Sequence, residues 1–375
     1  MRWVEGRRRR RPSPTLYTLK KTLQNIGLSP WSESQFESHL RDGLVAARVV
    51  AVHRTMMIVH DGRKEIKAEL TGRLQFIAVS PSDLPTVGDW VTIHVLDDGE
   101  FAVVHEVMPR RSVVVRKAAG SVVEEQLIAA NVDVAFIVQA CDMDFNLRRL
   151  ERYLAAVRTG NVRPIILLSK SDVISPDELQ HFVDDIHTIE PFLPIVPFSN
   201  NDPDQLASIE DLLEEGKTYC LIGSSGVGKS TLVNRLIGSE KLKTSAIREK
   251  DGKGKHTTTS RQLIVLKNKA VLIDTPGMRE FGAVGIESGL QETFLEIEIL
   301  AEDCKFGNFS HTVEVGCALL AAIETGELEA SRLNGFLKLK RESARNEMSL
   351  ADKRKKDRSL GKLYKRILDE KKDRR

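Results

Sequence analysis

The sequence predicts a multidomain α/β protein with three parts: a small N-terminal β-barrel of OB type, a mainly parallel sheet with helices on both faces, and a C-terminal helical domain. Three observations predict it. Short β-branched segments crowd the first third of the chain, apolar strand-like runs then alternate with helix-like runs, and helical spacing dominates after residue 290. A chain of 375 residues can bury two or three separate cores.

The predicted domains follow these changes of pattern. Residues 1–40 form a basic extension and a helical lead-in that stops near Gly27, and residues 41–115 form the barrel. An SH3-like barrel fits the barrel pattern almost as well as an OB-fold. The barrel strands are expected at residues 46–52, 55–60, 91–95 and 101–107, and its basic side chains are Arg48, Arg54, Arg63, Lys64 and Arg73.

The parallel sheet is expected within residues 116–289, because strand-like and helix-like runs alternate there. Residues 290–340 form the helical domain and residues 341–375 a basic helical tail. The expected strands are 132–138, 164–168, 194–198, 218–222, 262–266 and 271–273; the expected helices are 147–158, 229–237 and one that begins at Pro176.

Composition favours a cytoplasmic protein. Four scattered cysteines argue against a disulfide framework, no run of eighteen apolar residues exists, and the N-terminal arginines are followed by no apolar segment of a signal peptide. Residues 1–21 carry a balance of +7 and residues 338–375 one of +9, so with a net charge of +3 the middle carries −13. Two basic ends on an acidic body are typical of a protein that binds a polyanion, but tails that only increase solubility would show the same charge pattern.

The strongest motif is a phosphate loop between an apolar strand and a helix. Its glycines let backbone N–H groups face phosphates, Lys229 reaches the β- and γ-phosphates, and the Ser230 hydroxyl binds Mg²⁺. A chance glycine-rich turn is the alternative, but the flanking strand and helix argue against it. The motif is Gly223, Ser224, Ser225, Gly226, Val227, Gly228, Lys229 and Ser230, with Thr231 next to it.

Two further segments suit a nucleoside triphosphate and its Mg²⁺. Asp274 follows a strand and suits the aspartate that holds Mg²⁺ through water, while the backbone N–H of Gly277 senses the γ-phosphate. Residues 252–259 combine flexible glycines with threonines, as a switch loop requires, and Thr258 closes the Mg²⁺ shell. Taken alone, the threonine run suits a plain strand equally well.

A base-recognition motif precedes the phosphate loop. Ser169, Lys170 and Asp172 follow a strand; the Asp172 carboxylate can accept from N1–H and the amine of guanine, and the lysine stem can cover the ring. Ser199 and Asn200 suit the loop that contacts guanine O6. Taken alone, a surface lysine and a helix-capping aspartate would explain the motif better.

The motif order decides between these alternatives. In ordinary GTPases the phosphate loop comes first, whereas here the base motif precedes it by about fifty residues, which is a circular permutation. In this order the sequence resembles the ribosome small-subunit-dependent GTPase A family over roughly residues 20–340. The resemblance extends beyond the motifs, to residues 116–120, 130–133, 144–150 and 274–280.

The resemblance implies an OB barrel, a permuted GTPase domain and a zinc-binding helical domain. It implies GTP, GDP and Mg²⁺ as ligands, and the small ribosomal subunit with its rRNA as partner. The subunit would stimulate hydrolysis late in its maturation. No DNA or membrane partner is expected, and a monomer is expected. Met278 stands where other GTPases carry a water-orienting glutamine, and the resemblance assigns that role to His256.

The chain departs from the family pattern at two places. Cys304, His311 and Cys317 keep the spacing of the family's zinc motif, but Phe309 replaces its second cysteine, which leaves three ligands. Either Glu302, Asp303 or water completes the zinc shell, or the site is metal-free. Ser169 stands where the strictest guanine motif has asparagine, and serine is too short for the same contacts.

Two other classes of protein fit part of the pattern. One is a phosphate-loop ATPase, whose loop lysine and serine would look the same. The other is a non-catalytic RNA-binding module that keeps guanine nucleotide as a structural ligand. Adenine competition separates the first from a GTPase, and replacement of His256 by alanine separates the second.

Overall fold

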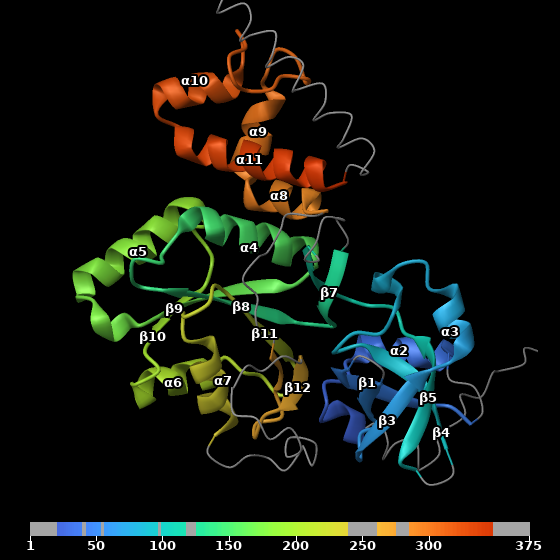
Figure 1. Cartoon of the computed structure of the whole chain (residues 1–375). Coiled ribbons are helices and arrows are strands. Elements are labelled where there is room, and N and C mark those ends of the chain that lie inside the picture. Colours follow the sequence, from blue (N-terminus) through green and yellow to red (C-terminus); the bar gives the residue numbers. More distant parts are fainter. Residues whose placement is uncertain are drawn as a thin grey trace, which may run out of the picture.

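The computed structural model describes residues 21–39, 43–53, 56–96, 99–117, 125–238, 261–274 and 285–347. Within these residues the chain forms a β-barrel, a central sheet covered by helices on both faces, and a group of C-terminal helices that sits above α4 (Figure 1). The predicted fold class is therefore confirmed. No helix in the described ranges combines the length and the apolar character that a membrane span requires.

The barrel has five strands that close on themselves. The pairing order is β1-β2-β3-β5-β4, and β4 pairs back onto β1. The helix α3 (Gly72–Ile77) lies between the third and fourth strands, as in an OB-fold. The strands are β1 (Val45–Val52), β2 (Met57–His60), β3 (Glu65–Leu70), β4 (Trp90–Val95) and β5 (Phe101–Val107).

Arg48 corrects one expectation about the barrel. Arg48 was counted among the basic side chains that the barrel presents, but it is fully buried and so not available to RNA. Its guanidinium donates to the carbonyl oxygens of Ile26 (2.6 Å), Gly88 (3.2 Å) and Asn131 (3.3 Å) and to the Thr218 hydroxyl (2.9 Å). Arg48 therefore joins the barrel to neighbouring elements, while Arg63, Lys64 and Arg73 are exposed. Arg54 lies outside the described residues.

The central sheet is parallel through five strands, in the order β10-β9-β8-β11-β13. The helices α4 and α5 cover one face, and α6 and α7 cover the other (Figure 1). The strands are β8 (Val134–Ala140), β9 (Arg163–Ser169), β10 (Ile195–Phe198), β11 (Thr218–Ile222) and β13 (Val271–Asp274). The helices are α4 (Leu147–Thr159), α5 (Pro176–Ile189), α6 (Pro203–Glu210) and α7 (Lys229–Ile237).

One strand pair joins the barrel to the central sheet. The strand β12 (Gln262–Val265) runs antiparallel to β13 on one side and to β1 on the other, where Gln262 lies opposite Ala51. The two parts thus share one 11-stranded sheet. A separate pair, β6 (Val113–Lys117) and β7 (Glu125–Ala130), lies between the barrel and β8. Neither this junction nor this pair was predicted from the sequence.

The C-terminal helices pack on α4 at short range. They are α8 (Glu287–Thr293), α9 (Leu295–Glu302), α10 (Ala318–Thr325) and α11 (Ala330–Glu347). A Cβ at Gly289 would lie 1.8 Å from the carbonyl oxygen of Ala155, so only glycine permits α8 to approach α4 this closely.

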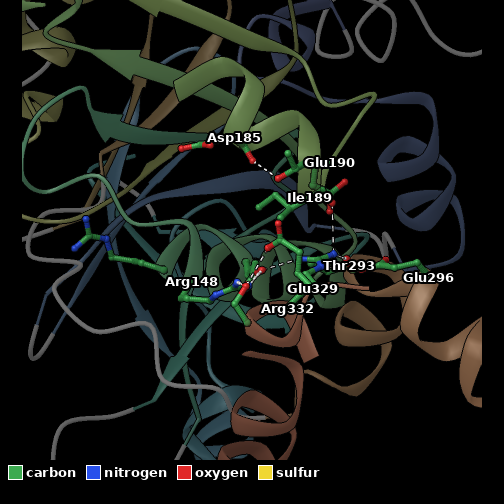
Figure 2. Close-up of polar contacts among 12 residues, drawn as sticks. Arg148, Asp185, Ile189, Glu190, Thr293, Glu296, Glu329 and Arg332 are labelled. Carbon is green, nitrogen blue, oxygen red and sulfur yellow. Dashed lines mark hydrogen bonds and ion pairs between the residues drawn. The ribbon is translucent and has the colours of Figure 1, made fainter. Parts of the chain in front are cut away.

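A buried arginine fixes α11 in the same place. Arg332 is 5% exposed and donates to Glu151 (2.8 Å), to Glu296 (2.7 Å) and to the carbonyl oxygen of Thr293 (2.7 Å). Its guanidinium also lies 4.2 Å from the ring centre of Phe294. Figure 2 shows Arg332 with Thr293 and Glu296 close by. Because Glu151 belongs to α4 and is fully buried, the network ties the C-terminal helices to the central domain.

Candidate nucleotide-binding site

Three parallel strands end at one edge of the central sheet. Ser169 ends β9, Ile222 ends β11 and Asp274 ends β13. Since the carboxyl ends of parallel strands form the usual ligand crevice of open α/β sheets, the predicted base motif, the phosphate loop and the predicted Mg²⁺ aspartate come to the same edge. The sequence predicted each segment separately, and the strand order explains why they converge.

The phosphate loop has the backbone conformation that its glycines permit. Gly226 and Gly228 have φ angles of 86° and 92°. A Cβ at Gly223 would lie 2.3 Å from the carbonyl oxygen of Val138, and one at Gly228 would lie 2.7 Å from Nδ2 of Asn200. The loop therefore requires glycine at its first position for close packing on β8 and at its sixth position for the turn into α7.

Lys229 begins α7 and folds back over the loop. Its ammonium donates to the carbonyl oxygens of Gly223 (2.8 Å) and Ser224. Burial lowers the pKa of Lys229 to about 8, against the opposing charges of Asp144 and Asp274. The ammonium thus occupies a desolvated position in which a phosphate is a strong partner.

The polar side chains next to Lys229 face solvent. Ser225 in the loop, and Ser230 and Thr231 in the first turn of α7, are exposed. Their position at a helix N-terminus agrees with the predicted phosphate and Mg²⁺ contacts, which stay predictions. Asp274, at the end of β13, is partly buried.

Ser169 and Lys170 occupy different environments at the end of β9. Ser169 is fully buried, and its hydroxyl lies 2.7 Å from the carbonyl oxygen of Val227 and 3.2 Å from that of Gln139. Serine was expected to be too short for the contacts that asparagine makes here; its hydroxyl instead hydrogen-bonds to the phosphate loop. Lys170 adopts a left-handed conformation, with φ of 61°, and turns the chain toward Asp172.

The Asp172 carboxylate is exposed and is aligned by its neighbours. Hydrogen bonds from Ser199 and Asn201 lower the pKa of Asp172. The Asn201 amide lies 3.3 Å from the carboxylate. Asn200, in the same loop, donates to the carbonyl oxygen of Gly228 at 3.3 Å. The predicted base loop at residues 199–200 therefore contacts both the base motif and the phosphate loop.

Two carboxylates near the site were missed from the sequence. Asp142 lies 2.7 Å from the ammonium of Lys170, and Asp144 accepts a hydrogen bond from the Ser224 hydroxyl at 2.5 Å. Both lie in the loop just after the buried strand β8, and Asp274 is the last residue of β13; this position at the end of a strand was the available signal. Three predicted site residues lie outside the described part of the chain: His256, Thr258 and Gly277. Met278 lies outside it as well.

The Cys/His segment does form a cluster. The sulfur atoms of Cys304 and Cys317 are 3.9 Å apart, and Nδ1 of His311 lies 3.8 Å and 3.3 Å from them. The Ala318 N–H also lies 3.3 Å from the Cys304 sulfur. Glu302 and Asp303 are exposed and do not belong to the cluster, and Phe309 packs against the C-terminal core instead.

A cavity at the opposite edge of the sheet is not part of this site. Its lining comes from the amino ends of β8, β9 and β11 and includes Arg111, Arg158 and Lys217. Acidic partners already neutralise these cations: Arg111 pairs with Asp133, and Arg158 pairs with Glu190 at 2.6 Å. These arginines are therefore already paired with carboxylates and do not form a positively charged binding site for a ligand.

The fold and the convergent motifs define a class of protein, a phosphate-loop GTPase whose motifs are circularly permuted. The profile of the RsgA GTPase family matches residues 107–284. The small ribosomal subunit biogenesis GTPase RsgA 2 of Vibrio parahaemolyticus is 41% identical over 360 residues, which cover 96% of each chain. The protein named RsgA in Opitutus terrae is 39% identical, over 86% of this chain and 90% of its own. The chain belongs to the RsgA GTPase family and is a GTP hydrolase.

Solved structures agree on the fold. YjeQ of Thermotoga maritima aligns with a TM-score of 0.57 and 24% identity over 79% of this chain and 97% of its own. YloQ, described as a circularly permuted GTPase, aligns with a TM-score of 0.58 and 23% identity, over 83% and 99% of the two chains. These structures confirm the predicted permuted fold with its OB barrel. The ATPase and non-catalytic alternatives are set aside because the relatives of about 40% identity are named GTPases.

Proposed function

We propose that this chain hydrolyses GTP to GDP and phosphate late in the maturation of the small ribosomal subunit, and that the subunit stimulates the reaction. The observation that carries the proposal is the convergence of a base motif and a phosphate loop, in permuted order, at one sheet edge. Support for the partner comes from relatives that are named small ribosomal subunit biogenesis GTPases.

Nucleotide binding would divide between the two motifs. Asp172 accepts from guanine N1–H and the exocyclic amine, and Lys170 lays its stem across the ring. The loop backbone and Lys229 take the phosphates. Ser230, Thr258 and Asp274 would hold Mg²⁺, which neutralises phosphate charge when it is bound. The exposure of Asp172 and Ser230 is consistent with these roles.

Hydrolysis requires a group that orients the attacking water. Met278 offers no useful hydrogen bond, so we assign the role to His256 in the switch loop, with Lys229 and Thr258 stabilising the phosphates. An imidazole that is placed only when the loop is ordered would make the unassisted reaction slow and partner-dependent.

The rRNA contacts are assigned to basic side chains that are exposed. Arg63, Lys64 and Arg73 on the barrel are accessible, and the basic runs at residues 1–21 and 338–375 add charge. Clustered lysine and arginine gain affinity for phosphate backbones by counterion release. Arg48 is excluded from this set because it is buried.

The Cys/His cluster fits a zinc ion. Zinc binds sulfur at about 2.3 Å and nitrogen at about 2.0–2.1 Å, usually in a tetrahedron. The sulfur and nitrogen atoms of such a site are therefore about 3.6–3.8 Å from one another. The observed separations of 3.3, 3.8 and 3.9 Å are close to this. Zinc would therefore be held by Cys304, His311 and Cys317. Metal analysis should find zinc in the purified protein and none in Cys304→Ser; absence of zinc from the native protein would refute the assignment.

The test of the function is GTP turnover by the purified protein, alone and with small ribosomal subunits. We expect slow turnover alone and strong stimulation by the subunits. His256→Ala should lose the stimulated turnover while it keeps GDP affinity. Turnover that the subunits do not change would overturn the proposed partner, and full activity of His256→Ala would overturn the assigned role of the histidine.

A further inference from the structure

We propose that the loop at residues 141–146, which follows β8, holds both halves of the nucleotide site in position. In this proposal Asp142 is a positioning residue for Lys170, and Asp144 is a positioning residue for the phosphate loop. The proposal rests on the nucleotide roles proposed above for Lys170 and the loop. It adds two residues that neither nucleotide motif contains.

The loop is held rigidly at its base by a buried glutamine. Gln139 in β8 is 1% exposed, and its amide brackets Asn146: Oε1 accepts from the Asn146 N–H (3.1 Å), and Nε2 donates to the Asn146 carbonyl (3.4 Å). At the tip, Asp142 Oδ1 accepts from the Asp144 N–H at 2.8 Å, which closes a local turn. These hydrogen bonds fix the loop backbone, so the aspartate side chains that it carries start from defined positions.

Asp142 directs the side chain of Lys170. Its Oδ2 lies 2.7 Å from the ammonium, and both side chains are only partly exposed, 31% and 39%. The hydrogen bond from Lys170 is the main cause that lowers the pKa of Asp142, so the Asp142 carboxylate is ionised at neutral pH. A lysine without a partner samples many rotamers, whereas an ion pair at the ammonium limits the rotamers of its methylene chain. The stem is the part that would cover the base.

Asp144 fixes the start of the phosphate loop. Its Oδ2 accepts from the Ser224 hydroxyl at 2.5 Å, and Arg149 holds the same carboxylate at 2.9 Å. Ser224 in turn presents its carbonyl oxygen to Lys229. The side chain of Ser224 therefore points to the β8 loop, while its backbone faces the phosphate side. Two carboxylates separated by a single residue thus contact the base side and the phosphate side of the proposed site.

The test is a double-mutant cycle on GDP affinity with the full-length protein. Asp142→Asn should weaken GDP binding about three- to tenfold, the range for loss of a partly exposed charged hydrogen bond. Lys170→Ala should weaken it at least as much. If Asp142 acts through Lys170, the double variant binds GDP as Lys170→Ala does. The same cycle is made with Asp144→Asn and Ser224→Ala. The matched control is Asp177→Asn, an exposed aspartate of α5, which should bind as the native protein does.

Each outcome decides the proposal. If the losses in GDP affinity are additive in a cycle, the aspartate of that cycle does not act through its partner, and its role as a positioning residue is wrong. Native affinity in Asp142→Asn, with impaired affinity in Lys170→Ala, would also overturn the role of Asp142. Native affinity in Lys170→Ala would instead overturn the proposed base contact. Asp142→Glu keeps the charge and should restore most of the affinity, which a general folding defect would not do. At saturating GTP the turnover number of Asp142→Asn should be unchanged, because the contact concerns binding.

Discussion

The Ser169 hydroxyl lies 2.7 Å from the carbonyl oxygen of Val227, so the strand that ends in the base motif is hydrogen-bonded to the phosphate loop. Ser169 is fully buried, and Val227 is 1% exposed. The contact joins two segments that are 58 residues apart in the chain. A serine at this position therefore fixes the phosphate loop to the end of β9. Lys170 and Asp172, for which the base contact is proposed, follow it in the chain.

Replacement of Ser169 by alanine should therefore affect both stability and binding. The Val227 carbonyl would lose its partner in a buried place, which costs about 1–3 kcal/mol. We expect a decrease of that size in the free energy of unfolding in urea, and GDP affinity that is several-fold weaker. Ser208→Ala, which removes an exposed hydroxyl on α6, is the control. Unchanged stability in Ser169→Ala would show that the contact is dispensable.

The lowered pKa of Lys229 predicts a pH dependence of nucleotide binding. Because the pKa in the free protein is about 8, below the ordinary 10.5, the buried ammonium loses its proton as pH rises through 8. Below pH 8 the folded protein carries the cost of a desolvated ammonium. Between pH 8 and 10.5 the folded state has released this proton and the unfolded state still holds it, so the free energy of unfolding of the nucleotide-free protein rises with pH.

Phosphate affinity should change in the opposite direction, because it needs the charged lysine. Between about pH 7 and pH 9 we expect GDP affinity to fall by up to about tenfold. Lys229→Arg keeps its charge across this range and should show a smaller pH dependence, whatever its absolute affinity. An equal decline in both proteins would assign the effect to another group.

Arg48 should act on stability and leave RNA binding unchanged. Arg48→Met removes four hydrogen bonds to buried oxygens and should lower the free energy of unfolding by about 2–4 kcal/mol. Arg73→Ala, on the exposed surface, should leave stability within about 0.5 kcal/mol and weaken rRNA binding with a smaller salt slope. A folded Arg48→Met protein with impaired RNA affinity would contradict the structural role.

The ion pair between Arg332 and Glu151 should stabilise the contact between the C-terminal helices and α4. Arg332→Met leaves the buried Glu151 with Arg148 as its remaining arginine partner, and we expect a loss of about 2–4 kcal/mol in urea unfolding. The double variant Arg332→Met, Glu151→Leu should recover part of that loss, since no buried charge remains unpaired. Arg341→Met, an exposed position on α11, is the control. A double variant as unstable as the single one would contradict this account.

Local signals made much of the fold predictable. The helix α7 (Lys229–Ile237) agrees with its predicted bounds because a glycine turn and an apolar strand define its start. The strand β3 (Glu65–Leu70) was missed because charged residues alternate along it and only Ile66 and Ala68 are buried. The β1–β12 junction and the burial of Arg48 depend on contacts between distant segments, which no local pattern reports.

In the candidate site, too, local patterns predicted some residues, while others depend on contacts between distant segments. The phosphate loop and Asp172 follow from motif spacing, since their chemistry requires those residue types in that order. Asp142 and Asp144 carry no such spacing rule, and their roles emerge only when β8, β9 and β11 lie side by side. The predicted domain boundaries, the monomeric state and the absence of a DNA partner stay predictions.

The most direct test of the account is the base preference of Asp172→Asn. Xanthine presents a carbonyl oxygen where guanine presents an amine, so an asparagine, which can donate, should favour xanthosine diphosphate over GDP. The account predicts that Asp172→Asn loses more than about a hundredfold in GDP affinity and gains affinity for xanthosine diphosphate. If Asp172→Asn binds GDP as tightly as the native protein and ignores xanthosine diphosphate, Asp172 does not recognise the base, and the assignment of the nucleotide site is wrong.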